Sequence, residues 1–562
     1  MVRVFVKTGA AAAVGPRVII SSISLVWSVF YSINLVLTPL LAYMSEDMPW
    51  HVPPPPPLVY SPFDVFVTNM TSFLQAIYNN DTFPHANSEI FLHSAATYDM
   101  RLRLTLPPSI TDCQTTMLQF PGHFFYGRGI REYVCAYLSL NTTARSVYTA
   151  TSMCQHDMMV GLPLTDGCLW ITPVESESYV VDYAHHIRPG PAFAWFKLMY
   201  RITLTVAVLW VIWTRYYAHY IPLMQNLRHF GLRDDELDDG VVFTKLVVYL
   251  GDPTYFVLSH PLVTTAMVFD FWLSAVNIGI AMGDVSQFQQ LWPFVRSCVY
   301  ASRGVWSAYL TMLCLSLLVK QKRWEHNITS VDPGILAIAI VIYVGPIACL
   351  IQNSALVIMF QSTFMVSVPS TEQWSSIEVF PSILNAVVFT AAFPLTLSVA
   401  HAWCNRRHSP DLTTRRGSHY ASVQYNDVKL KLLWFGLAPF LTPKTRAGYI
   451  AHIGGTVQRL FAFDPGYKKL PFFSLRASDC FVLCYDVHGE LVTKARLSLV
   501  TGLDRQDRQT SALTIHLCPA VHGYSVGIIN DHPCQSVVGP TDGYPYNSQW
   551  LHLGAAQCQW VL

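Results

Sequence analysis

Long apolar runs with few charged side chains constrain this chain more than any other feature. A helix needs about 20 apolar residues to cross the hydrocarbon core of a bilayer. We therefore predict transmembrane helices at residues 18–44, 196–214, 261–283, 297–319, 334–360 and 379–403. The composition agrees, because 52% of the 562 residues are hydrophobic and 13% are charged. That charged share is about half of what soluble domains carry.

The first apolar run is too long for a cleavable signal peptide, whose apolar core spans roughly 7–15 residues. Residues 18–44 hold no charged side chain and follow Arg3, Lys7 and Arg17. We interpret the run as a signal anchor that stays in the chain, after a cytosolic N-terminus at residues 1–17. A mitochondrial presequence would fit the start of the chain, which lacks acidic residues, but not the segment that follows.

Basic residues orient the predicted helices, because cytosolic loops are enriched in Lys and Arg. The loops at 284–295 and 361–378 contain neither residue, whereas the N-terminus and the segments after the second, fourth and sixth runs are basic. The basic segment after the second run is the predicted cytosolic loop 215–260. We therefore expect both termini in the cytosol, and the protein in the plasma membrane or an endomembrane.

Residues 45–191 carry the marks of a lumenal or extracellular domain. Acceptor motifs for N-glycosylation begin at Asn69, Asn80 and Asn141. Alternating apolar and polar residues from 100 to 106 indicate half-buried strands. The segment also contains Cys113, Cys135, Cys154 and Cys168. These cysteines can form two disulfides in three ways, and the sequence does not choose between them. We predict a β-rich, disulfide-stapled ectodomain.

The last part of the chain, residues 404–562, begins with a polar basic linker and continues as strand-like segments, so we predict a small β-rich cytosolic domain. Its cysteines and histidines raise the question of a zinc site. Cys480 and Cys484 lie four residues apart within a strand-like run, a spacing that favours buried free thiols over a zinc knuckle. The acidic stretch 232–240 matches no calcium-binding loop and favours a solvated turn. We therefore predict no metal and no other cofactor.

Polar residues inside the predicted helices are the strongest candidates for function, because a charge in the hydrocarbon core is costly. They are Asp270, Asn277, Arg303 and Asn353. Asp270 lies near the middle of the third run, and Arg303 lies in the outer third of the fourth, antiparallel run. Their heights differ by roughly 7 Å at 1.5 Å per residue, which the two side chains can bridge. We predict that Asp270 and Arg303 form an ion pair.

The predicted fold is an α-helical multi-pass membrane protein with about six transmembrane helices, an ectodomain after the first helix, and a cytosolic C-terminal domain. The layout resembles, in outline, the polycystin–mucolipin channels and one half of an RND-type transporter. It departs from the channels in its short outer loop 361–378, and from the transporters in its long cytosolic loop after the second helix and in lacking a duplicate half.

The sequence contains no recognisable catalytic motif, so we do not expect an enzyme. The net charge of +1 gives no reason to expect a nucleic-acid partner. Two functions remain. A channel or transporter would conduct a solute along the polar faces of the helices. A receptor-like or scaffolding protein would recognise an extracellular ligand through its ectodomain and a cytosolic protein through its tail. In both cases the lipid bilayer is a partner.

Overall fold

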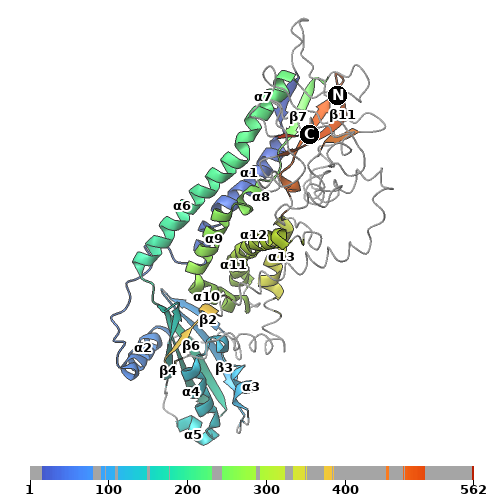
Figure 1. The fold of residues 1–562 in the computed structure, drawn as a ribbon. Helices are drawn as coiled ribbons and strands as arrows, with labels where there is room; N and C mark the ends of the chain where they lie inside the picture. Colours follow the sequence, from blue (N-terminus) through green and yellow to red (C-terminus); the bar gives the residue numbers. More distant parts are fainter. Residues whose placement is uncertain are drawn as a thin grey trace.

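The computed structural model consists of two β-sheets separated by a bundle of helices (Figure 1). It describes residues 16–79, 90–147, 152–230, 243–286, 291–322, 333–347, 373–381, 451–454, 475–499 and 560–561, except for single positions inside these ranges, and a few isolated residues between them.

The first sheet is built mainly from one continuous stretch of the chain. Its strand order is β2-β3-β6-β5-β4-β8. The strands are β2 (Ile90–Ser94), β3 (Thr97–Thr105), β4 (Ser152–Met159), β5 (Leu162–Glu175), β6 (Ser178–Ile187) and β8 (Ser376–Glu378). The neighbouring strands from β2 through β3, β6 and β5 to β4 all pair antiparallel, and β8 pairs in parallel with the edge strand β4. This sheet forms the core of the predicted ectodomain.

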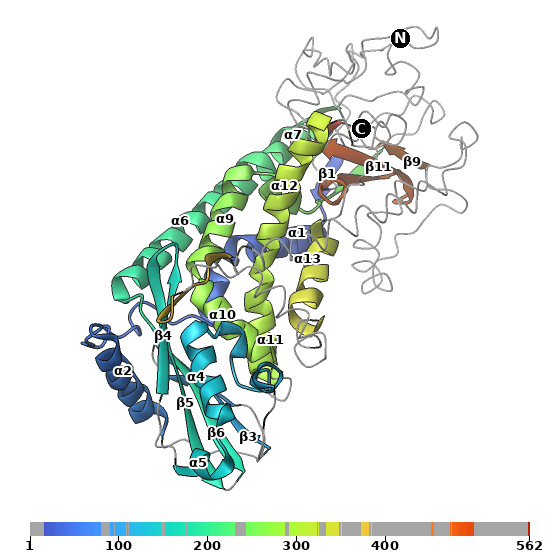
Figure 2. The ribbon, with the colours of Figure 1, turned by 60° about the horizontal axis from the view of Figure 1, so that its bottom comes forward.

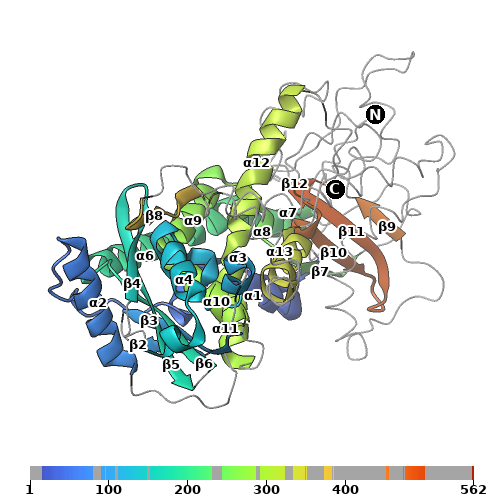
Figure 3. The ribbon, with the colours of Figure 1, turned by 90° about the horizontal axis from the view of Figure 1, so that it is seen from below.

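Two helices cover opposite faces of this sheet, α2 (Phe63–Tyr78) and α4 (Arg128–Ser139) (Figure 3). Successive residues of a strand point to opposite faces, and β5 shows the consequence. Trp170 packs with Phe66 of α2, whereas Leu169 packs in the cluster that contains Ile130 of α4. The short helices α3 (Cys113–Met117) and α5 (Thr142–Val147) flank α4.

Both disulfides of the predicted ectodomain are local. Cys113 pairs with Cys135, 22 residues later, and joins α3 to α4. Cys154 pairs with Cys168, 14 residues later, and joins the adjacent strands β4 and β5. The structure therefore selects one of the three pairings that the sequence allows.

The second sheet is assembled from distant parts of the chain. Its strand order is β1-β7-β10-β11-β12, with β9 also paired to β11. The strands are β1 (Arg17–Ile20), β7 (Lys245–Tyr249), β9 (Ala451–Gly454), β10 (Cys480–Tyr485), β11 (Leu491–Leu499) and β12 (Trp560–Val561). β1 runs parallel to β7, and β7 runs antiparallel to β10. The predicted N-terminus, cytosolic loop and tail thus share one sheet.

The helices between the sheets are α1 (Ser22–Leu37), α6 (Pro191–Arg215), α7 (Tyr220–Phe230), α8 (Thr254–Leu258), α9 (Pro261–Leu273), α10 (Ala275–Ser286), α11 (Leu291–Ala301), α12 (Val305–Lys322) and α13 (Pro333–Ile342). Among the described residues, two continuous helical stretches are long and apolar enough to cross a membrane, Pro191–Arg228 and Leu291–Val319. A bent pair, α9 with α10, would make a third. The prediction of six transmembrane helices, and with it the predicted fold class, is therefore wrong for the chain as described.

The predicted helix at 261–283 breaks at Ser274, where α9 ends and α10 turns away by 69°. The second half then packs both on α11 and on the first sheet. Ile280 joins the buried cluster of the ectodomain, and Gly283 lies so close to Phe91 of β2 that a Cβ atom would be 2.6 Å from its ring. Apolar residues of α10 therefore serve the core of the ectodomain.

The predicted helix at 18–44 is also interrupted. Residues 17–20 belong to strand β1, and α1 then extends for 16 residues before a 3₁₀ turn at Leu40–Met44. Of the run at 334–360, the structure describes α13 and a π-helical turn, Tyr343–Ile347, that contains Pro346. Nearly all of the run at 379–403 lies outside the described residues. The apolar run at 18–44 therefore contains a strand, a helix and a turn, which hydropathy alone does not distinguish.

Candidate functional site

The most unusual feature of the bundle is a cluster of buried charged side chains, which we call the charge cluster: Glu46, Lys197, Arg201, Asp270 and Arg303. Its members come from the segment after α1, from α6, from α9 and from the 3₁₀ turn Ser302–Gly304 between α11 and α12. Helical spacing explains the positions on α6 and α9. Arg201 lies on the same inward face as Ala194, Leu204 and Val208, and Asp270 lies on the face of Val263 and Met267.

Asp270 binds two arginines at once. Arg303 donates through Nη2 to one carboxylate oxygen, so the structure contains the predicted ion pair. Arg201, which the prediction did not include, donates through Nε to the other oxygen at 2.8 Å. The Asp270 side chain is 2% exposed and that of Arg201 is fully buried. The pair is thus one part of a larger network.

Glu46 is the second anion of the charge cluster. Arg201 donates to both of its oxygens, at 2.9 and 2.8 Å, and Lys197 donates to it at 2.7 Å. The Tyr300 hydroxyl donates at 2.6 Å, and Nη1 of Arg303 lies 3.6 Å away. Burial alone would raise the pKa of the Glu46 carboxyl, but the neighbouring cations outweigh burial and hold that pKa well below its ordinary value.

The charge cluster carries three cations and two carboxylates. All four carboxylate oxygens accept hydrogen bonds, whereas Nη1 of Arg303 makes none within the described residues and faces Glu46 at 3.6 Å. Ser274 completes it by accepting a hydrogen bond from Nη2 of Arg201 at 2.8 Å. Such a network is strongly destabilised when one partner is removed, because a buried charge is then left without its counter-ion. Its chemistry is that of a clamp that joins four segments. It offers no nucleophile or open metal position.

Asp270 and Asn277, both predicted within one helix at 261–283, do not lie on one continuous helix. Ser274 lies at the break, and Asn277 lies beyond it on α10, where it is half-buried and separated from Asp270 by the bend. Asn353 lies outside the described residues. Sequence reasoning also missed Glu46 and Arg201. The available signal was two basic residues, Lys197 and Arg201, inside an apolar run, with an acidic residue two positions after another run.

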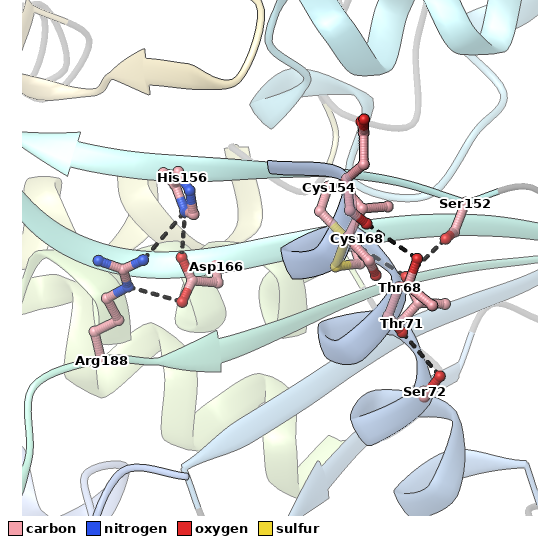
Figure 4. Close-up of a disulfide and its surroundings, with 11 residues drawn as sticks. Thr68, Thr71, Ser72, Ser152, Cys154, His156, Asp166, Cys168 and Arg188 are labelled. Carbon is pink, nitrogen blue, oxygen red and sulfur yellow. Dashed lines mark hydrogen bonds and ion pairs between the residues drawn. A yellow bond between two sulfur atoms is a disulfide. The ribbon is translucent and has the colours of Figure 1, made fainter. Parts of the chain in front are cut away.

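The ectodomain holds a second buried polar group between adjacent strands (Figure 4). Asp166 on β5 is buried and binds Nδ1 of His156 on β4 at 2.7 Å and Nε of Arg188 at 2.7 Å. The guanidinium of Arg188 stacks on the Tyr60 ring at 4.1 Å. The three side chains tie the ends of β4, β5 and β6 together, close to the start of α6.

Two of the three predicted glycosylation sites can be placed. Asn69 is exposed on α2, and Asn141 is exposed where it caps α5 through a hydrogen bond from the Ala144 amide at 2.8 Å. Asn80 lies outside the described residues. In the second sheet, Cys480 and Cys484 are buried and belong to no disulfide, and the residues that the structure describes contain no group of three metal-binding side chains.

Comparisons with known proteins give this architecture no relatives. No family model, curated protein or solved structure matches the chain.

Proposed function

We propose that the protein is a receptor-like or scaffolding membrane glycoprotein of the secretory pathway or cell surface. In this proposal the helices hold a recognition domain on the lumenal or extracellular side and the composite sheet on the cytosolic side. The chain alternates between the two sheets four times: from β1 to β2, from β6 to β7, from β7 to β8 and from β8 to β9. This alternation supports a multi-pass arrangement with both ends of the chain on one side.

The observation that carries the proposal is the closed charge cluster. A permeation pathway needs polar groups that face water or a passing solute. Asp270 instead has both oxygens bound by arginines, and the side chains of Glu46, Arg201 and Arg303 are at most 5% exposed. This geometry favours a structural clamp that fixes the ectodomain to the bundle over the channel or transporter that the polar helices suggested.

The outer surface of α6 supports contact with lipid. Its exposed large side chains are Trp195, Phe196, Met199, Ile202, Val206, Leu209, Trp210 and Trp213. From Trp195 to Trp213 the helix rises about 27 Å, close to the roughly 30 Å hydrocarbon core of a bilayer. Tryptophan at both ends of such a stretch is typical of the two membrane interfaces.

The proposal is tested by sidedness and flux together. In sealed vesicles from secretory cells, glycans at Asn69 or Asn141 and a tag after residue 562 should lie on opposite sides of the membrane. Purified protein in liposomes should add no ion conductance above that of empty liposomes. A conductance that Asp270→Asn abolishes, in a variant that folds normally, would refute the scaffold and favour transport.

A further inference from the structure

The hairpin turn between β4 and β5 contains a valine, Val160, where the backbone conformation and the exposure to solvent both disfavour one. Met159 pairs with Leu162, so the turn consists of Val160 and Gly161, with φ values of 54° and 75°. Two-residue turns with both φ angles positive normally hold Asn, Asp or Gly, because a β-branched side chain is disfavoured there. Burial does not compensate for this backbone strain, since Val160 is 70% exposed.

The whole tip of this hairpin is apolar. Residues 158–164 read Met-Met-Val-Gly-Leu-Pro-Leu, and Leu162 is 66% exposed. The turn amides are nevertheless satisfied without water. The carboxylate of Glu378 accepts hydrogen bonds from the amides of Val160, at 2.7 Å, and Gly161, at 3.1 Å. Pairing of these two amides and the exposed apolar side chains lower the cost of placing the turn against an apolar medium.

The tip points toward the end of the ectodomain where the chain enters the bundle. Ile187, the last residue of β6, pairs with Thr165, and α6 begins four residues later at Pro191. The hairpin continues three residues past Thr165 to Leu162, or about 10 Å at 3.3 Å per residue. Figure 2 shows this end of β4 next to α6. Phe380, two residues after Glu378, contacts the Trp272 ring of α9 at 5.5 Å between centroids.

We infer that the β4–β5 tip dips into the outer leaflet of the membrane and holds the ectodomain against it. The ligand is the boundary between lipid headgroups and acyl chains, where exposed Val and Leu side chains lose contact with water. The inference rests on the proposed function, because it requires α6 to lie in a bilayer. Together with the charge cluster, the tip gives the ectodomain a second attachment, to lipid instead of to the helices.

The test uses spin labels on the full-length protein in lipid nanodiscs. A nitroxide is attached at Val160→p-acetylphenylalanine, and at Leu162→p-acetylphenylalanine to sample a site outside the turn. Val174→p-acetylphenylalanine is the matched control, since Val174 is 45% exposed near the other end of β5. Leu209→p-acetylphenylalanine reports on the exposed face of α6. The relaxation of each label is measured with oxygen, which concentrates in lipid, and separately with a water-soluble nickel chelate.

Oxygen should relax the labels at 160, 162 and 209 more than the nickel chelate does, and the order should reverse at 174. Stronger relaxation by nickel at both 160 and 162, with oxygen still stronger at 209, would overturn the membrane-dipping tip alone. Stronger relaxation by nickel at 209 would overturn the proposed function and the tip with it. Stronger relaxation by oxygen at 174 as well would also overturn the inference, because lipid contact would then not be specific to the tip.

Discussion

The two sheets of this protein are built in opposite ways. Strands β2 to β6 of the ectodomain follow one another within residues 90–187, and both disulfides close loops of at most 22 residues. The second sheet joins residues 17–20, 245–249 and 480–499, which are hundreds of positions apart. The charge cluster follows the second pattern, since it joins Glu46, Arg201, Asp270 and Arg303. A destabilising substitution in the predicted ectodomain should therefore have local effects, whereas one in the charge cluster or the second sheet should affect distant segments.

The largest effect is expected from the long-range pattern, in the charge cluster. Arg201→Met leaves Glu46 and Asp270 without their shared cation and should lower the free energy of unfolding by about 3–5 kcal/mol. Lys197→Met is the matched control, because Lys197 is 12% exposed and contacts Glu46 alone among the cluster carboxylates. Unfolding in lipid or detergent measures both variants. Equal losses for the two would mean that the charge cluster has no centre at Arg201.

The same region gives a sharp test of the ion pair itself. Swapping the charges with Asp270→Arg and Arg303→Asp would rescue an isolated pair. Here the new arginine would face Arg201, and the new aspartate would face Glu46. We therefore expect the double variant to fold no better than either single variant, measured as folded yield. Recovery by the swap would show that Asp270 and Arg303 act as a pair and that the larger network is unimportant.

In the ectodomain, the comparison predicts a loss that stays local. Cys154→Ser with Cys168→Ser removes a disulfide that closes a loop of 14 residues, which is worth about 3 kcal/mol. Hydrogen exchange should accelerate in β4 and β5 while β10 and β11 keep their protection. Loss of protection in the second sheet would break the distinction between the two regions.

A smaller effect is expected where two distant segments of the second sheet touch. Gly251→Ala would place a methyl group 2.6 Å from the backbone oxygen of Asp479, so β7 and β10 must shift, at a cost of about 1–3 kcal/mol. Gly190→Ala is the matched control, because its new methyl group would meet only Pro55 at 3.5 Å. Thermal unfolding compares them. An unchanged midpoint for Gly251→Ala would argue against the close approach.

The smallest effect separates the two roles of Asn141. Asn141→Ala removes the cap of α5 and the glycan site, and should cost about 1 kcal/mol. Asn141→Asp removes only the glycan site, because its carboxylate still accepts the Ala144 amide hydrogen bond. Both variants should lose the same shift in gel mobility, and only the alanine variant should lose stability. If the wild-type protein and the two variants migrate equally, Asn141 carries no glycan.

The contrast between the regions also sets what the sequence could predict. Alternation, cysteine count and acceptor motifs are local, so the strands and cysteines of the ectodomain were within reach. The pairing of β1 with β7 was not, because β1 looks like the start of an apolar run and strand partners leave no local mark. The break at Ser274 has no proline or adjacent glycine to announce it. The Asp270–Arg303 contact followed from the cost of a buried charge, and the same reasoning applied to Arg201 would have called for Glu46.

The most direct test is to produce the two parts separately. Residues 45–191, secreted on their own, should form both disulfides and show strong amide protection in β3, β5 and β6. Residues 404–562 on their own lack β1 and β7, so β10 and β11 should exchange rapidly, whereas the same strands should be protected in the full-length protein. Slow exchange of β10 and β11 in the isolated tail would show that residues 404–562 fold by themselves, and would contradict the composite sheet.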